Sequence, residues 1–159
     1  MATGAILTPF AAEFPTSNFP ELRKVNGRPA LAYDASTNET AYWTLAAPEG
    51  LTTPVSLVIT VIMASATSGD TDWDVAVEAI TDGDAVDLDA TTSFDTVNSQ
   101  DNNSVPGTAG YMQQITVTLT NNDSVAAADY IRISLTRDAA SDTAAGDAFV
   151  LIAELRDST

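Results

Sequence analysis

The sequence predicts an all-β protein, a two-sheet antiparallel β-sandwich of jelly-roll type with an extended N-terminal arm. The most apolar run, Val55–Ala64, carries apolar side chains at every odd position and is rich in β-branched residues. That spacing is typical of a strand with one dry face. The other periodic segments also repeat with period two, and none shows a convincing helical period. Turn-forming residues separate most of them, giving about eight strands, as sandwiches have.

The amino-acid composition excludes several partners and several kinds of catalytic chemistry. The chain of 159 residues is long enough for one domain with a real core. Its 22 acidic and 6 basic residues give a net charge of −16, which makes nucleic acid and anionic lipid poor partners. The chain has no Cys and no His, which removes disulfides, thiolate chemistry and the Ser–His and Cys–His nucleophile pairs. No secretion-signal pattern is visible, and the longest apolar run, about ten residues, is too short to span a membrane.

Residues 1–29 differ from the rest of the chain. They hold four of the seven prolines, and three of these adjoin Phe10, Phe14 and Phe19. X-Pro pairs favour extended backbone, so we expect an arm that docks its Phe rings on a neighbouring subunit or another protein. The alternative is that the rings cover an edge of the arm's own sandwich. Three of the six basic residues follow, and we expect them to meet acidic groups of a partner unless they are simply solvated: Arg23, Lys24 and Arg28.

Residues 30–159 then read as the sandwich domain. Along its strands, apolar and polar residues alternate, with Trp43 and Trp73 on inward faces. The short turn Ser65–Thr71 predicts a hairpin between the central run and the strand after it. The expected strands are Ala30–Tyr33, Ala41–Ala46, Val55–Ala64, Trp73–Ile80, Ser93–Val97, Gln114–Thr120, Tyr130–Thr136 and Phe149–Leu155.

Polar loops separate the strands and carry the candidate chemistry. Asp70, Asp72 and Asp74 begin like an EF-hand loop, but Val75 stands where that loop needs glycine. A better set of oxygen ligands surrounds Gly83, and Ca²⁺ is the cation it would take, unless the loop is only a solvated acidic surface. These weak metal candidates are Asp82, Asp84, Asp87 and Asp89. Apart from that cation, no cofactor is expected.

Catalysis has little support in the sequence. Acidic pairs suitable for glycoside hydrolysis arise by chance among so many carboxylates, and no set of cleft-forming aromatic residues accompanies them. Serine and threonine nucleophiles lack a base. Because both Trp residues are assigned to the core, Tyr111 and Tyr130 are the remaining candidates for stacking on sugars. We therefore predict a protein that is not an enzyme.

From Arg28 to Asp157 the chain resembles a group of small virion structural proteins of tailed bacteriophages, of the head-decoration type. The segments that carry the resemblance are Tyr42–Thr44, Met63–Asp70, Val75–Asp84, Ser93–Asp95, Val105–Met112, Leu119–Ser124 and Arg132–Asp138. The resemblance implies a β-sandwich on the virion that assembles as a homotrimer. The arm upstream of Ala30 is not part of the matched pattern.

Two functions follow as expectations. The first is a capsid decoration, or cement, protein that binds the outer shell as an oligomer, with a major capsid or other virion protein as its partner. In that role the arm residues Phe10, Phe14, Phe19, Arg23, Lys24 and Arg28 would bind the partner. The second is a phage fibre or receptor-binding module that recognises host surface glycans through the loops Asp82–Asp89 and Asn98–Gly110.

Overall fold

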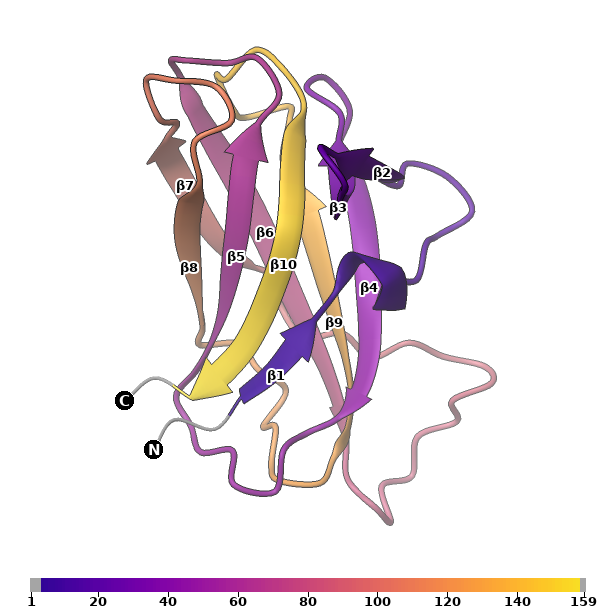
Figure 1. Cartoon of the computed structure of the whole chain (residues 1–159). Coiled ribbons are helices and arrows are strands. Elements are labelled where there is room, and N and C mark those ends of the chain that lie inside the picture. The colour runs from indigo at the N-terminus through magenta and orange to yellow at the C-terminus, as the bar shows by residue number, and fades with distance from the viewer. Residues whose placement is uncertain (1–3, 158–159) are drawn as a thin grey trace.

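The computed structural model describes residues 4–157 and consists of two antiparallel sheets packed face to face (Figure 1). One sheet has six strands in the order β2-β3-β10-β5-β8, with β1 pairing to β10 beside β3. The other has four strands in the order β4-β9-β6-β7. The predicted all-β sandwich is thus confirmed. No helix among the described residues is long and apolar enough to cross a membrane.

The strand bounds follow the alternation in the sequence. The six-stranded sheet contains β1 (Gly4–Leu7), β2 (Glu21–Val25), β3 (Arg28–Tyr33), β5 (Val55–Met63), β8 (Gln113–Leu119) and β10 (Ala148–Asp157). The four-stranded sheet contains β4 (Glu39–Ala46), β6 (Asp70–Ile80), β7 (Asn98–Ser104) and β9 (Tyr130–Arg137). One short 3-10 turn, η1 (Pro9–Ala11), follows β1.

The core lies between the sheets. From the six-stranded sheet, β5 contributes Leu57 and Ile59, and from the other sheet β6 contributes Trp73 and Val75, all of them buried. Full burial of a side chain of this size stabilises the fold by about 1.5–3 kcal/mol. Trp43 and Trp73 are both core residues, as the sequence predicts.

The predicted hairpin between the central run and the next strand is wrong. β5 pairs with β10 and β8, whereas β6 pairs with β7 and β9 in the opposite sheet. The connection over residues 64–69 therefore crosses the sandwich instead of turning within one sheet. An apolar inward face does not discriminate between the two arrangements, because neighbouring strands of one sheet and facing strands of two sheets both turn such a face to the core.

The strand predicted at Ser93–Val97 is displaced. The observed strand β7 covers Asn98–Ser104, part of a segment expected to be a polar loop. It is the edge strand of its sheet, pairs only with β6 and has mostly exposed side chains. An edge strand of this kind lacks the apolar alternation on which the prediction relied.

The described part of the predicted arm belongs to the sandwich. β1 pairs with β10 and β2 pairs with β3, so the predicted boundary after residue 29 falls inside β3. Between these strands the segment follows the free edge of β4: Glu13 forms a bridge with Tyr42, and the Trp43 indole Nε1 donates a 2.9 Å hydrogen bond to the Thr8 carbonyl. The backbone of the described part of the arm therefore pairs with its own domain, whereas Phe10, Phe14 and Phe19 remain exposed, and their docking on a partner stays a prediction.

Candidate functional site

The outer face of the four-stranded sheet is the candidate site. On β9, Ile131, Ile133 and Leu135 are fully buried in the core. The intervening residues Tyr130 and Arg132 therefore point outward. In the register of the sheet, Arg132 stands between Thr44 of β4 and Glu78 of β6, and Tyr130 stands between Ala46 and Ile80.

Arg132 forms the centre of an aromatic cluster. Its guanidinium carbon lies 5.1 Å from the centre of the Tyr42 ring and 5.4 Å from that of Phe94, and the two rings are 5.8 Å apart. Both contacts are within the range of cation–π attraction. The guanidinium also lies 3.9 Å from the Glu13 carboxylate and 3.8 Å from the Glu78 carboxylate. Its charge is thus balanced locally, and the rings are held in place around it.

Phe94 reaches this face because the segment before β7 is tied to β6. The Asp95 backbone N–H donates to the Val77 carbonyl at 2.8 Å, and the Ser93 N–H donates to Glu78 Oε1 at 2.6 Å. Glu78 is buried, so it is fixed by Ser93 on one side and Arg132 on the other. These contacts hold Phe94 and Glu78 in place within the protein itself.

A cleft of about 340 Å³ lies where β6 ends and β9 begins, two residues along β9 from Arg132. Tyr130, which is 41% exposed, forms one wall, and the loop after β6 forms the other. The loop is braced by the Thr81 N–H, which donates to Asp84 Oδ2 at 2.9 Å, and by the Thr81 hydroxyl, which donates to Asp129 Oδ1 at 2.9 Å. The lining residues are Ile80, Thr81, Asp82, Gly83, Asp84, Val86, Leu88, Ala128 and Tyr130.

The cleft and the cluster form one surface. Tyr130 and Arg132 are two residues apart on the same side of β9, a step of roughly 6.8 Å along a strand. On the neighbouring strand β6, Ile80 and Glu78 are likewise two residues apart on the outward side, opposite Tyr130 and Arg132. A ligand lying along β9 would therefore meet the exposed Tyr130 ring first and the Tyr42–Phe94 rings next, with carboxylates at the side. Concave surfaces with aromatic walls and a few fixed polar groups bind small or chain-like ligands.

The predicted metal candidates divide between the cleft and the rest of the loop after β6. Asp82 and Asp84 line the cleft, whereas Asp87 and Asp89 do not. No group of three or more acidic side chains suited to a metal ion occurs among residues 4–157. The loop instead uses Asp84 to accept a hydrogen bond from its own backbone.

The predicted partner-binding residues are spread over two places. Phe14 and Phe19 stack on each other with ring centres 5.5 Å apart, while Phe10 on η1 is 68% exposed. Arg23 pairs with Glu21 at 2.6 Å, and Lys24 and Arg28 lie at the β2–β3 hairpin. The structure therefore brings Phe14, Phe19 and Arg23 together, since Phe19 and Arg23 line one pocket, whereas Arg28 lines a different one.

The aromatic–cation cluster was missed by sequence reasoning. A signal was present in part: Tyr42, Glu78 and Arg132 each occupy an outward position in an alternating strand. Phe94 and Glu13 lie in irregular segments, where period-two alternation gives no orientation.

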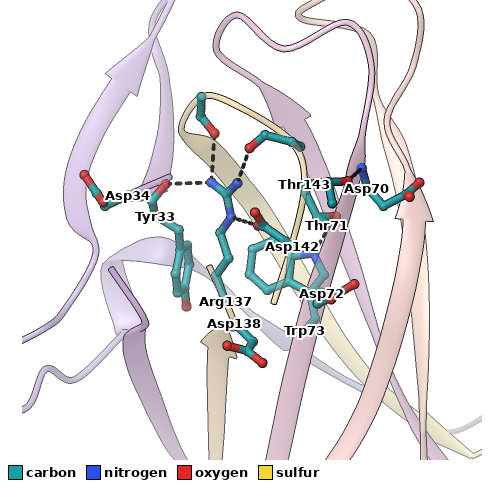
Figure 2. A network of polar contacts seen from close by, with 12 residues as sticks. Tyr33, Asp34, Asp70, Thr71, Asp72, Trp73, Arg137, Asp138, Asp142 and Thr143 are labelled. Atoms are coloured by element: carbon teal, nitrogen blue, oxygen red, sulfur yellow. Dashed lines mark hydrogen bonds and ion pairs between the residues drawn. The ribbon is translucent and has the colours of Figure 1, made fainter. Parts of the chain in front are cut away.

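A second polar cluster, at the opposite end of the sandwich, is structural. The buried Arg137 guanidinium donates to the carbonyls of Tyr33, Ala144 and Gly146 and, at 2.7 Å, to Asp142. Figure 2 shows Arg137 between Tyr33 and Asp142. The Tyr33 hydroxyl donates to the Leu135 carbonyl nearby, and burial raises the pKa of Tyr33 well above its usual value. No buried side-chain polar atom of the described residues lacks a partner, so this cluster offers nothing to a ligand.

No protein-family model and no curated protein matches the sequence. Several solved structures resemble the fold, among them two carbohydrate-binding modules. A family 35 carbohydrate-binding module from Clostridium thermocellum gives a TM-score of 0.51 at 12% identity, covering 98% of this chain and 99% of that chain. A family 28 carbohydrate-binding module described as specific for non-crystalline cellulose gives a TM-score of 0.50 at 13% identity, covering 89% and 84%. The chain is thus similar in fold to carbohydrate-binding modules of the jelly-roll type, while the virion assignment stays a prediction.

Proposed function

We propose that this protein is a non-catalytic glycan-recognition module whose binding surface runs along β9 from the Tyr130 cleft to the Tyr42–Phe94 rings. The observation that carries the proposal is the exposed Tyr130 ring in a cleft that continues into a preformed aromatic cluster. Pyranose rings have an apolar C–H face and a hydroxyl rim. An aromatic ring flanked by fixed carboxylates presents the complementary chemistry.

The comparisons support this choice over the alternatives. Both structures reported above are carbohydrate-binding modules, and their fold matches this chain over most of its length. The chain also contains no histidine, the side chain that most often serves as a general acid or base.

The charge of the site sets the expected ligand class. Arg132 is balanced by Glu13 and Glu78, and the cleft adds Asp82 and Asp84. Carboxylates accept hydrogen bonds from sugar hydroxyl groups but repel uronate and sulfate groups. The proposed ligands are therefore neutral oligosaccharides or polysaccharides.

The test is a titration of the full chain with neutral oligosaccharides, such as gluco-, manno- and xylo-oligomers, and with an oligogalacturonate of equal length. Calorimetry should give binding to at least one neutral series and none to the acidic one. Tyr130→Ala should weaken that binding tenfold or more, equivalent to about 1.4 kcal/mol.

Tyr111→Ala is the matched control because Tyr111 is also an exposed tyrosine, 65% accessible, but does not line the cleft. It should leave the affinity unchanged. Equal losses in the two variants, or binding to none of the neutral series, would remove the basis of the proposal.

A capsid decoration role is the second candidate, favoured by the exposure of Phe10 on an ordered turn. η1 is held by backbone hydrogen bonds from Ala11 to Thr8 and from Ala12 to Pro9, so the ring is presented rather than folded away. An exposed aromatic side chain of this kind is a common anchor in protein interfaces. Deleting residues 1–29 would also remove strands β1 and β2 of the sandwich. The substitution Phe10→Ser tests the decoration role without that loss.

A further inference from the structure

Strand β2 forms one edge of the six-stranded sheet and has a neighbouring strand, β3, on one side only (Figure 1). Four of its five residues are exposed, and the fifth, Val25, is partly buried. The backbone groups of β2 that face away from β3 are therefore open to another chain. An unpaired strand edge of this kind is a template for pairing with a further strand.

The geometry of the β2–β3 hairpin identifies the open backbone groups. The two-residue turn Asn26-Gly27 makes Val25 and Arg28 a hydrogen-bonded pair of residues. Along an antiparallel pair of strands, such pairs alternate with pairs that share no hydrogen bond. Leu22 and Lys24 occupy the positions without hydrogen bonds to β3. Their N–H and C=O groups therefore point toward the free edge.

Two observations agree with this assignment. Pro29, which stands opposite Lys24, has no N–H that it could donate to β2. Among residues 4–157, no backbone hydrogen bond outside the sheet ladders involves Leu22 or Lys24. The Leu22 side chain is also 43% exposed, so the edge offers apolar surface beside the open backbone groups.

The charges on β2 match a second copy of the same strand. Glu21 and Arg23 lie on one face of β2, on either side of Leu22. In an antiparallel pair of β2 strands centred on Leu22, Glu21 of each copy stands opposite Arg23 of the other. Opposite charges at facing positions stabilise a strand pair, and like charges destabilise it. Pairs centred on Arg23 or on Lys24 would instead place two identical cations face to face.

We propose that two copies of the chain pair antiparallel through β2, centred on Leu22, so that their six-stranded sheets join across a two-fold axis. Each Leu22 N–H donates to the Leu22 carbonyl of the other copy, and each Lys24 N–H donates to the Pro20 carbonyl. The interface is isologous, because the same surface is used by both copies. The proposal is independent of glycan binding, since β2 and β9 belong to different sheets.

Long-range repulsion opposes this contact, because each copy has a net charge of −16. The β2–β3 hairpin is a favourable place for two copies to meet, since it holds three of the six basic residues, Arg23, Lys24 and Arg28. At about 0.15 M salt the Debye length is roughly 8 Å, which screens the repulsion between whole molecules but leaves contacts between facing charges. Dimerisation should therefore be weaker at very low salt.

The first test is sedimentation velocity of the full chain from micromolar to millimolar concentration at about 0.15 M salt. The average mass should rise from the 16.6 kDa of one chain toward that of two chains and no further. A mass that stays at one chain throughout this range would overturn the proposal. A rise toward three chains would do the same, because a strand edge that is paired to its own copy has no room for a third.

Two charge reversals test the register of the pair. Arg23→Glu leaves only carboxylates at the facing positions, and Glu21→Arg leaves only guanidinium groups, so each variant alone should dimerise roughly tenfold more weakly than the wild type. An equimolar mixture of the two should recover dimerisation, because the facing charges are then opposite. A mixture that stays monomeric would refute the register.

The matched control for these reversals is Arg156→Glu. Arg156 is also an exposed arginine of the six-stranded sheet, paired with Glu154 two residues away on β10. Its reversal should leave dimerisation unchanged, and so should Tyr130→Ala, which weakens the proposed glycan binding. A loss in Arg156→Glu equal to that in Arg23→Glu would show that net charge, and not the β2 edge, controls association.

Backbone amide hydrogen exchange locates the contact without changing any charge. The N–H groups of Leu22 and Lys24 should exchange freely at low protein concentration and become protected as the dimer forms. The Arg23 N–H, which faces β3, is the internal control and should change far less with concentration. Association without new protection at Leu22 and Lys24 would assign the contact to another surface and overturn the proposal.

Discussion

Arg137 is the residue that joins the loop 138–147 to the core. Its guanidinium is fully buried and bonds to three backbone carbonyls as well as to the Asp142 carboxylate. A buried ion pair gives little net stability compared with an apolar pair, but the loss of one partner leaves a charge and several acceptors unsatisfied. The loop therefore depends on this one side chain.

Arg137→Met should lower the free energy of unfolding by about 3–5 kcal/mol. Arg156→Met, which removes an exposed arginine paired with Glu154, should lower it by at most about 1 kcal/mol. Urea unfolding followed by tryptophan fluorescence measures both, because Trp43 and Trp73 are buried. Similar small losses in the two variants would show that the Arg137 network does not stabilise the fold.

At the residue scale, alternation predicts orientation well where a strand is regular. It places both Trp residues in the core, and the structure confirms this. In β9 every second residue from Ile131 points inward, and Arg137 is the next such position after Leu135. The sequence interpretation missed it because the predicted strand ended at Thr136. Phe94 had no such signal, because hydrogen bonds from Ser93 and Asp95 to β6, rather than strand periodicity, put its ring beside Arg132.

At the scale of elements, the connection between β5 and β6 decides which sheet each strand joins. Gly69 lies in this connection with a φ of +90°, and a Cβ there would lie 2.6 Å from the Thr143 carbonyl oxygen. The Ala144 N–H and the Thr143 N–H both donate to the Asp70 carbonyl at 3.0 Å. The crossing between sheets is thus packed directly against the loop that Arg137 holds.

Gly69→Ala should destabilise the protein by the cost of a left-handed backbone, about 1–2 kcal/mol, plus about 1–3 kcal/mol for overpacking. Gly83→Ala is the control, because Gly83 has a φ of +97° but open space around its Cβ position. It should show the backbone cost alone. Thermal unfolding measures both variants. Equal decreases in Tm would mean that the loop at Thr143 moves away from the added Cβ without a cost in stability.

Element prediction failed where local pattern and tertiary pairing differ. The spacing between β5 and β6 is compatible with a hairpin or with a crossing between sheets, and only the pairing of β5 with β10 and β8 excludes the hairpin. β2 was missed for another reason. Its turn, Asn26-Gly27, has positive φ at both residues and is the dipeptide that favours a two-residue hairpin, but the surrounding prolines suggested an arm.

At the scale of the whole molecule, the two sheets present different chemistry to their surroundings. The four-stranded sheet and its end loop carry an aromatic cluster, a cleft and carboxylates. The six-stranded sheet carries an apolar groove that Arg28 lines. Composition alone gave the excess of acidic residues but not this division, because the division arises from strand pairing between distant segments.

The most direct test of the glycan-binding proposal is the mapping of backbone amide chemical shifts during titration with the neutral oligosaccharide that binds best. The proposal predicts that the shifted amides gather along β9 near Tyr130 and Arg132, at Phe94, and in the loop after β6. Shifts centred on the β2–β3 hairpin and Met112, or no shifts at millimolar ligand, would contradict it.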